Sequence, residues 1–454
     1  MLSVINPATG EVIAELAQDT PETIAQKAEA ARGAQAAWAA RPLAERVAVI
    51  QSFRERVADQ VDALAAILTS EVGKPLQQAR NEVKGTLGRL DFFVEHVEQL
   101  LGADRVLDTE AMREEISWDP LGLVVNISAW NYPWFVGSNV FLPALLTGNA
   151  VLYKPSEYAS RTGLRIAELL WESGVPREVF APVIGAGQTG ATLLQQEADG
   201  VFFTGSYATG KAISAALAGR FVHLQLELGG KDPVYVCEDV DVEKAAAGLA
   251  DGAFYNTGQS CCAVERIYVH DSVYDDFVAH FQREVEGFQI GDPTEEGTYI
   301  GPLTREPQLD VLAAQVKDAT DRGATLRCGG ARLERPGYYF APTLLTEVDH
   351  SMAVMRDETF GPMIGIQRVS GDAEAVAQMN DTTYGLTSSV FTPDEQRARA
   401  ILGQVNSGTV YWNCCDRVSP RLPWSGRGHS GMGLTLSTEG IRAFTRPRAW
   451  HLRP

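Results

Sequence analysis

The chain is poor in basic residues relative to acidic ones. It has 39 Lys and Arg against 58 Asp and Glu in 454 residues, a formal net charge of −19 at pH 7. An electrostatic field of that sign repels nucleic acids and anionic membrane surfaces. We therefore expect no nucleic-acid partner and no membrane partner.

Long hydrophobic runs are also missing. No apolar stretch approaches the ~20 residues that a membrane-spanning helix needs. Residues 1–10 contain neither the cationic segment nor the apolar core of a signal peptide. Both absences lead us to expect a cytoplasmic protein.

Cysteine and metal-binding motifs are sparse. Six cysteines are present, four of them in the adjacent pairs Cys261-Cys262 and Cys414-Cys415, and none lies in a paired CxxC spacing. The seven histidines form no HExxH motif, so no metal site is expected. Six cysteines are too few for a disulfide-stapled secreted fold. We expect reduced thiols, one of which could be a nucleophile.

The pattern of apolar residues predicts an α/β protein. Alanine-rich runs over 21–102 carry apolar residues three to four apart and predict helices, with breaks at Pro42 and at 73–75. From residue 121, short apolar runs alternate with helix-like stretches, which favours a parallel, doubly wound sheet. A second mixed α/β region is expected over 238–428, after a hinge at 229–233.

Two glycine-containing turns could bind a phosphate group. Residues 185–190 match GxGxxG, but no acidic residue follows about 20 positions later, so an ordinary strand-to-helix turn is the alternative. In 201–211 an apolar strand ends at Gly205 and a helix is expected to begin near Ser206. The amides of that helix end could face an anion, or Ser206 could be a simple helix cap.

Three side chains have contexts that suit catalysis. Cys261 follows a Gly-Gln turn, where a helix N-terminus would favour the thiolate, although buried packing is the alternative. Glu227 lies in an apolar run, where desolvation would raise its pKa toward that of a general base, unless it pairs with Lys231. The amide of Asn131 could stabilise an oxyanion or simply occupy a turn.

In combination, the motifs resemble those of the aldehyde dehydrogenase superfamily, in the same order and over essentially the whole chain. The start at 5–12 is similar to that of the family. The other matching segments are Trp130-Asn131, Lys154–Glu157, Gly205–Gly210, Glu227–Lys231, Gly258–Cys261, Glu358–Pro362 and Ser430–Gly433.

The resemblance implies a fold and an assembly. It predicts a Rossmann-like cofactor domain, an α/β catalytic domain and a small β oligomerisation arm. The implied ranges are 1–101 and 121–229 for the NAD-binding domain, 230–428 for the catalytic domain, and 102–120 with 446–454 for the arm. Members of the family assemble through that arm, so a homodimer or homotetramer is expected.

The resemblance also implies a reaction, the oxidation of an aldehyde to a carboxylic acid. Cys261 would be the nucleophile and would pass through a thiohemiacetal and a thioester. The side chain of Asn131 and the Cys261 backbone N–H would form the oxyanion hole. Glu227 would activate the water that hydrolyses the thioester.

The implied cofactor is NAD. Lys154 and Glu157 would hold the adenine-side ribose, and a carboxylate there would repel the 2′-phosphate of NADP, which makes NADP the less favoured cofactor. The 185–190 turn would then only neighbour the adenine pocket. The cofactor-binding residues implied by the resemblance are Trp130, Lys154, Glu157, Gly205, Ser206, Gly210, Glu358 and Phe360.

The substrate is a small aldehyde whose identity stays open. Tyr132, Trp134 and Trp424 could wall an apolar pocket. Arg417 or Arg421 could instead bind a carboxylate, as in a semialdehyde such as succinic semialdehyde, or both could be solvated.

Two alternative functions stay open, and one position differs from the pattern of the family. A coenzyme A-dependent acylating enzyme is one alternative, which the presence of Glu227 disfavours, and a catalytically silent relative is the other. Many relatives have a glutamate with a proposed proton-relay role where this chain has Thr435.

Overall fold

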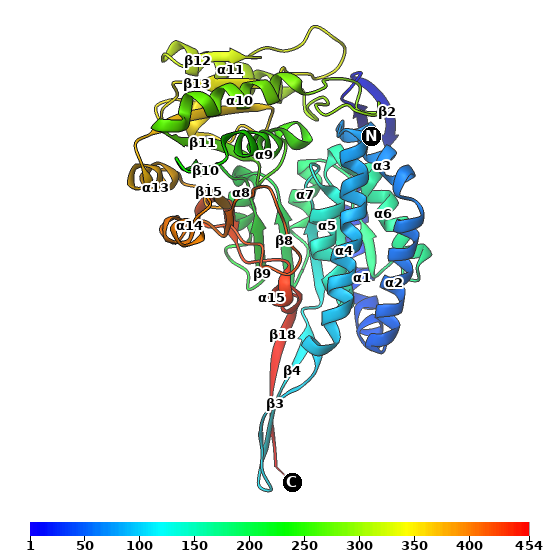
Figure 1. Ribbon diagram of the computed structural model, residues 1–454. Helices are drawn as coiled ribbons and strands as arrows, with labels where there is room; N and C mark the ends of the chain where they lie inside the picture. Colours follow the sequence, from blue (N-terminus) through cyan, green and yellow to red (C-terminus); the bar gives the residue numbers. More distant parts are fainter. Residues whose placement is uncertain (454) are drawn as a thin grey trace.

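Two sheets and a slender β arm organise the chain (Figure 1). The structure is a computed structural model that describes residues 1–453. The first sheet has the strand order β17-β9-β8-β5-β6-β7, the second β12-β13-β14-β11-β10-β15-β16, and the arm β18-β4-β3. The predicted α/β fold with a small β arm is confirmed.

The strands are β1 (Leu2–Asn6), β2 (Glu11–Leu16), β3 (Asp104–Asp108), β4 (Arg113–Pro120), β5 (Leu123–Ile127), β6 (Ala150–Lys154), β7 (Phe180–Pro182), β8 (Gly200–Thr204), β9 (His223–Glu227), β10 (Asp232–Val236), β11 (Val264–His270), β12 (Thr325–Cys328), β13 (Thr343–Thr346), β14 (Met363–Val369), β15 (Thr387–Phe391), β16 (Thr409–Trp412), β17 (Gly431–Met432) and β18 (Thr445–Leu452). The α-helices are α1 (Pro21–Ala39), α2 (Leu43–Asp59), α3 (Val61–Val72), α4 (Leu76–Leu101), α5 (Pro133–Leu146), α6 (Ser160–Glu172), α7 (Gly187–Leu193), α8 (Tyr207–Leu217), α9 (Val242–Phe254), α10 (Tyr274–Gly287), α11 (Pro307–Asp321), α12 (Ala353–Arg356), α13 (Asp372–Asn380), α14 (Glu395–Leu402) and α15 (Ser437–Arg442).

The N-terminal helices begin and end at local signals. Thr20 caps α1 through a capping box. The break predicted at Pro42 separates α1 from α2. The break predicted at 73–75 follows α3, because Gly73 ends that helix with φ 77° and a Cβ there would lie 2.5 Å from the Pro302 ring. Both predicted breaks are confirmed.

The strand order of the first sheet creates a crevice. Strands β5 to β9 pair in parallel, and the order reverses between β5 and β8. In such sheets ligands bind beyond the carboxyl ends of the strands at the reversal point. The 185–190 turn follows the edge strand β7 instead, so it lies away from the reversal point.

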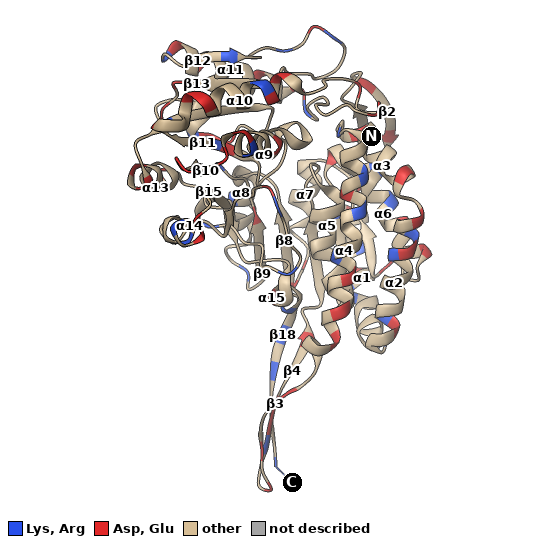
Figure 2. Cartoon of the chain, viewed as in Figure 1, with Lys and Arg blue, Asp and Glu red and all other residues tan. Residues whose placement is uncertain are grey.

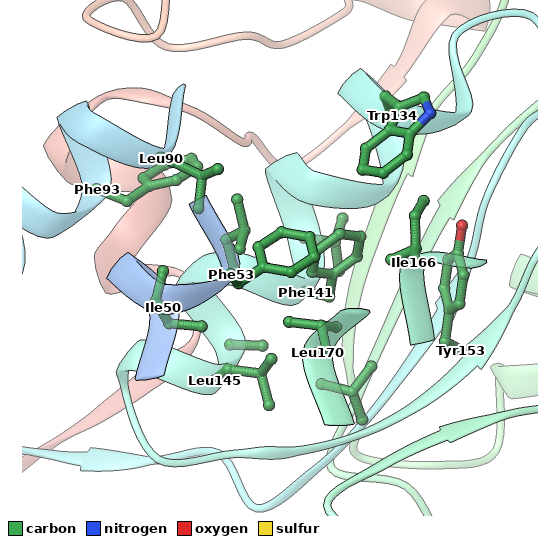
Figure 3. Close-up of a cluster of buried hydrophobic side chains, with 14 of the residues drawn as sticks. Ile50, Phe53, Leu90, Phe93, Trp134, Phe141, Leu145, Tyr153, Ile166 and Leu170 are labelled. Carbon is green, nitrogen blue, oxygen red and sulfur yellow. The ribbon is translucent and has the colours of Figure 1, made fainter. Parts of the chain in front are cut away.

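A large hydrophobic core holds α2, α4, α5 and α6 against this sheet. Figure 3 shows Phe53 and Phe141 close together among aliphatic side chains, and their rings meet edge to face. Helices therefore cover the first sheet on the side of α4 and α5. The loops at the carboxyl edge of the sheet are attached to elements that this close-packed core holds in place.

The arm projects from the body (Figure 1). Strand β18 pairs with β4 along its whole length, from Thr445 opposite Pro120 to Leu452 opposite Arg113. Val106, Leu107 and Trp450 of the arm are exposed hydrophobic residues.

Charged residues of both signs are dispersed along the outer helices (Figure 2). Within residues 1–453, no helix is both long and apolar enough to cross a membrane.

Candidate active site

Four predicted site segments lie at the carboxyl ends of neighbouring strands of the first sheet. Lys154 and Glu227 are the last residues of β6 and β9. Gly205 directly follows β8, and Asn131 lies in the loop between β5 and α5. Because parallel strands end at one edge, residues up to 100 positions apart meet there.

These residues border one cavity of about 1220 Å³. Of the predicted catalytic and cofactor-binding residues, those that line it are Trp130, Asn131, Lys154, Glu157, Gly205, Ser206, Glu227, Cys261, Glu358 and Phe360. Gly210 does not line it. A Cβ at Gly210 would lie 2.6 Å from the Leu228 side chain, so this glycine allows α8 to approach that segment.

The loop before Cys261 has an unusual backbone. Asn256, Thr257 and Gly258 all have positive φ values, of 55°, 57° and 70°. A Cβ at Gly258 would lie 2.2 Å from the carbonyl oxygen of Gly361, so only glycine allows that approach. The expectation of a helix N-terminus behind Cys261 is wrong, because the chain enters strand β11 at Val264 instead.

The two adjacent cysteines differ in environment. Cys261 is partly exposed and lines the cavity. Cys262 is buried and donates a hydrogen bond from Sγ to Asp416 Oδ1 at 3.0 Å. The neighbouring Cys261 thiol and burial raise the pKa of Cys262 well above its usual value. Of the two thiols, Cys261 is therefore the accessible one.

Asn131 is tied to the nucleophile loop. It is 5% exposed, and its Nδ2 donates a hydrogen bond to the carbonyl oxygen of Gln259 at 3.2 Å. Asn256 Nδ2 donates to the carbonyl oxygens of both Asn131 and Gln259. These bonds orient the amide of Asn131 toward the segment that carries Cys261, where an oxyanion would form.

Glu227 is a buried carboxyl group without a cationic partner within 4 Å among residues 1–453. Its suggested pairing with Lys231 is wrong, since Lys231 Nζ contacts Glu265 Oε2 at 2.6 Å. Thr435 Oγ1 donates a hydrogen bond to Glu227 Oε1. Burial raises the pKa of Glu227 to about 7, against the opposing effect of Thr435.

Hydrogen bonds from two other segments hold the loop that carries Glu358 and Phe360. Glu265 accepts hydrogen bonds from the backbone N–H groups of Thr359 and Phe360. Glu358 Oε1 accepts one from the Gly230 N–H at 3.1 Å. A Cβ at Gly229 would lie 2.1 Å from this carboxylate, so a larger residue there would displace the Glu358 side chain.

The other half of the cavity fits the nucleotide part of a dinucleotide. Ser206 caps α8 by accepting from the Thr209 N–H, and Gly205, Ser206 and Thr209 line the cavity, so the N-terminal end of this helix lies at its wall. Lys154 is 4% exposed and Glu157 Oε2 lies 3.9 Å from its Nζ. A buried cation, a helix N-terminus and an open cavity together suit a phosphate-bearing ligand.

The residues predicted for the substrate pocket lie elsewhere, and none borders this cavity. Trp134 and Trp424 are buried in the hydrophobic core, and Figure 3 shows Trp134 among its members. Arg417 and Arg421 are exposed. Tyr132 is partly buried, with the Lys74 ammonium 3.6 Å from its ring centroid.

Several buried charged residues near the site were not predicted from the sequence. Glu265 and Asp416 contact the Phe360 loop and Cys262, respectively. Lys74, just before α4, forms a buried ion pair with Glu82, and Arg89 lies about two helical turns beyond Glu82 on α4. Charged residues at this spacing on a helix are usually exposed, so nothing in the sequence indicates that Glu82 and Arg89 are buried.

Comparisons with known proteins agree with this geometry. Residues 1–450 match the model of the aldehyde dehydrogenase family. Betaine aldehyde dehydrogenase of Brucella anthropi is 35% identical over 95% of this chain and 89% of its own length. NADP(+)-type succinate-semialdehyde dehydrogenase of Deinococcus radiodurans is 34% identical, over 98% and 94% of the two chains.

A solved structure shows the same fold. Betaine aldehyde dehydrogenase from Staphylococcus aureus in complex with NAD+ superposes with a TM-score of 0.96 at 29% identity, covering 99% of this chain and 91% of that one. With a family model that spans nearly all residues and relatives above 30% identity over nearly their full lengths, the chain belongs to the aldehyde dehydrogenase family.

Proposed function

We propose that the protein oxidises an aldehyde to a carboxylic acid with NAD. The observation that carries the proposal is that Cys261, Asn131 and Glu227 border the same cavity. A nucleophile, an oxyanion donor and a base are the groups that acyl transfer through a covalent intermediate needs.

The first step is the attack of Cys261 Sγ on the aldehyde carbon. The negative charge that develops on the aldehyde oxygen is stabilised by Asn131 Nδ2–H and by the backbone N–H of Cys261. Glu358 and Phe360 would hold the nicotinamide of a bound NAD, which would accept the hydride that leaves the carbon as the thiohemiacetal becomes a thioester.

The second step is hydrolysis of the thioester. The Glu227 carboxylate removes a proton from water, and the hydroxide equivalent attacks the thioester carbon. The carboxylic acid then leaves and Cys261 is restored. Thr435 holds one oxygen of Glu227, which leaves the other oxygen free to accept the proton.

The direct test is NADH formation with purified protein and a panel of aliphatic, aromatic, ω-amino and ω-carboxy aldehydes. NADH and free carboxylic acid should form without coenzyme A. If NADH forms only when coenzyme A is supplied, the enzyme is an acylating dehydrogenase and the hydrolytic proposal is wrong.

The rate of hydrolysis should depend on the ionisation of Glu227. Since its pKa is about 7 and the base acts only when deprotonated, kcat should fall below pH 7 by about tenfold per pH unit and level off above pH 8. A pH profile of kcat, measured with a saturating aldehyde, checks this. A kcat that is flat from pH 5 to 8 would contradict the role of Glu227.

Thr435 should set the pH at which kcat falls. Its hydroxyl donates to the Glu227 carboxylate and so stabilises the ionised form, which means that Thr435→Val should raise the pKa of Glu227 further. The acidic limb should move to higher pH by about one unit, the size of one hydrogen bond. Thr435→Ser keeps the donor and is the matched control, with an unshifted limb.

Glu157 should oppose the binding of NADP. A carboxylate near the adenine-side ribose repels a 2′-phosphate, so Glu157→Gln should raise kcat/KM for NADP relative to NAD by roughly tenfold. Steady-state kinetics with both dinucleotides measures the ratio. Glu168→Gln, an exposed change of the same kind on α6, should leave the ratio unchanged. No change in Glu157→Gln would argue against the NAD assignment.

The arm suits assembly with further copies of the chain. Its exposed Val106, Leu107 and Trp450 form apolar surface on a projecting hairpin and strand. We propose a homodimer or homotetramer, which light scattering of the purified protein distinguishes from a monomer.

A further inference from the structure

A set of buried charged residues lies on α4 and the turn before it, next to the nucleophile. Lys74 and Glu82 form an ion pair whose side chains are both fully buried. Glu82 Oε1 also accepts the backbone N–H of Trp134 at 2.9 Å. Glu82 is therefore paired directly with Lys74, and it acts on the next cation along α4 only from a distance.

That cation is Arg89, which is 5% exposed. Its Nε donates to Asn139 Oδ1 at 3.1 Å, and its guanidinium lies 3.6 Å from the centroid of the Phe135 ring. Its Nη1 makes one long bond of 3.4 Å to the carbonyl oxygen of Gly85, and Nη2 makes none. Among residues 1–453, no carboxylate lies within 4.0 Å of it.

A buried guanidinium with only neutral partners is unusual. Arginine is rarely buried without a counter-ion, because desolvation of the cation is costly. Burial lowers the pKa of Arg89 to about 10, so the group is still a cation at neutral pH. The two Nη atoms lack strong acceptors, and a planar anion such as a carboxylate would supply them.

Arg89 contacts the helix that follows the oxyanion-hole residue Asn131. Its contacts Phe135 and Asn139 are on α5, within two turns of the helix that directly follows Asn131. It is close enough to Cys262 and Glu227 to interact with them electrostatically. It does not border the cavity that the three catalytic residues and the cofactor-binding residues share. The cation therefore lies near the catalytic residues but outside that cavity.

The nearby carboxyl group of Asp416 has other partners. Its Oδ1 accepts hydrogen bonds from Ser260 at 3.1 Å and from Cys262 at 3.0 Å. Burial raises the pKa of Asp416 to about 6, and the carboxylate is already bonded to these two donors. An anionic substrate is therefore favoured over a cationic one.

We propose that Arg89 binds the carboxylate of the substrate, which makes the preferred substrates short ω-carboxy aldehydes. The proposal rests on the proposed aldehyde oxidation and names the substrate class of that site. The guanidinium would form two parallel N–H···O bonds to the carboxylate while the aldehyde carbon faces Cys261. Arg417 and Arg421, both exposed, would then have no such role.

The experiment compares succinic semialdehyde with butanal, which has the same number of carbons and no charge. For the wild-type protein we expect a higher kcat/KM with the ω-carboxy aldehyde. Arg89→Gln should lower that value by at least about 30-fold, the loss expected for one partner of a buried charged pair, and should change the value for butanal by less than about threefold. Arg89→Lys should restore part of the loss.

Three further variants test whether the loss of activity is specific to Arg89. Arg80→Gln is the matched control, because Arg80 lies on the same helix but pairs at the surface with Asp62 and Glu296. It should leave both rates unchanged. Arg417→Gln and Arg421→Gln should each cost less than Arg89→Gln. A larger loss in either of them would overturn the assignment to Arg89.

A binding measurement separates this proposal from the proposed function. Succinate, titrated by calorimetry into wild-type protein in the presence of NAD, should bind, and Arg89→Gln should abolish the binding. If no aldehyde is oxidised, the proposed function is wrong. The binding of succinate then still tests whether Arg89 binds a carboxylate. An equal loss for both aldehydes, a preference for ω-amino aldehydes, or succinate binding that survives in Arg89→Gln would overturn the proposal.

Discussion

Replacing Cys261 by alanine should abolish aldehyde oxidation and leave dinucleotide binding intact. Without the thiol no covalent intermediate forms, and a loss on the order of 10⁴-fold or more in kcat is expected. Cys261 lines the cavity but contributes no charge to its nucleotide half, so NAD affinity should change little. Steady-state NADH formation measures the first effect, and quenching of tryptophan fluorescence on NAD titration measures the second, because Trp130 borders the cavity.

The adjacent thiol provides the discriminating comparison. Cys262 is buried and bonded to Asp416, so Cys262→Ala should retain substantial turnover, reduced only by the loss of packing. If Cys262→Ala were inactive and Cys261→Ala active, the assignment of the nucleophile would be reversed. If both variants were active, the covalent mechanism would be wrong.

Replacing Glu227 by glutamine should separate the two halves of the reaction. Thioester formation needs Cys261 and Asn131, whereas hydrolysis needs a base. Glu227→Gln should therefore give a burst of NADH stoichiometric with active sites, followed by steady-state turnover reduced by roughly 10² to 10⁴-fold, the usual contribution of general-base catalysis. Stopped-flow absorbance resolves the two phases.

Chemical rescue tests the same assignment. Hydroxylamine attacks a thioester without help from a base, so it should restore steady-state turnover of Glu227→Gln and produce a hydroxamic acid. Glutamine can still accept the Thr435 hydrogen bond, so the local structure should be preserved. A variant without a burst and with a normal steady state would show that another group activates the water.

The general architecture could be predicted from local patterns. Alternating apolar runs and helix-like stretches after residue 121 indicated the parallel sheets. Pro42, which precedes α2, and Gly73, which ends α3 with a positive φ, mark helix boundaries through their own backbone preferences. The carboxyl ends of strands also carry the motif residues Lys154, Gly205 and Glu227. Parallel strands end at one edge, so the sequence order already implied that these residues meet.

Other expectations failed where they depended on contacts with distant segments. The thiol of Cys261 was expected at a helix N-terminus, but its local turn leads into a strand whose position is set by β10 and β14 on either side. Lys231 was the nearest cation to Glu227 in sequence, yet it pairs with Glu265 on β11. Glu227 instead contacts Thr435, 208 residues away.

The amino-acid sequence determined the family and the reaction class, and it predicted the residues proposed to carry the chemistry, because those residues stand in contiguous motifs. The tertiary structure alone decided which charges are neutralised and which are left without a partner. Lys74 meets Glu82 and Lys231 meets Glu265, while the buried Arg89 has no carboxylate within 4.0 Å among residues 1–453. Burial and pairing depend on surfaces contributed by several segments of the fold, so the affinity of the site for a particular aldehyde follows from packing and not from any single motif.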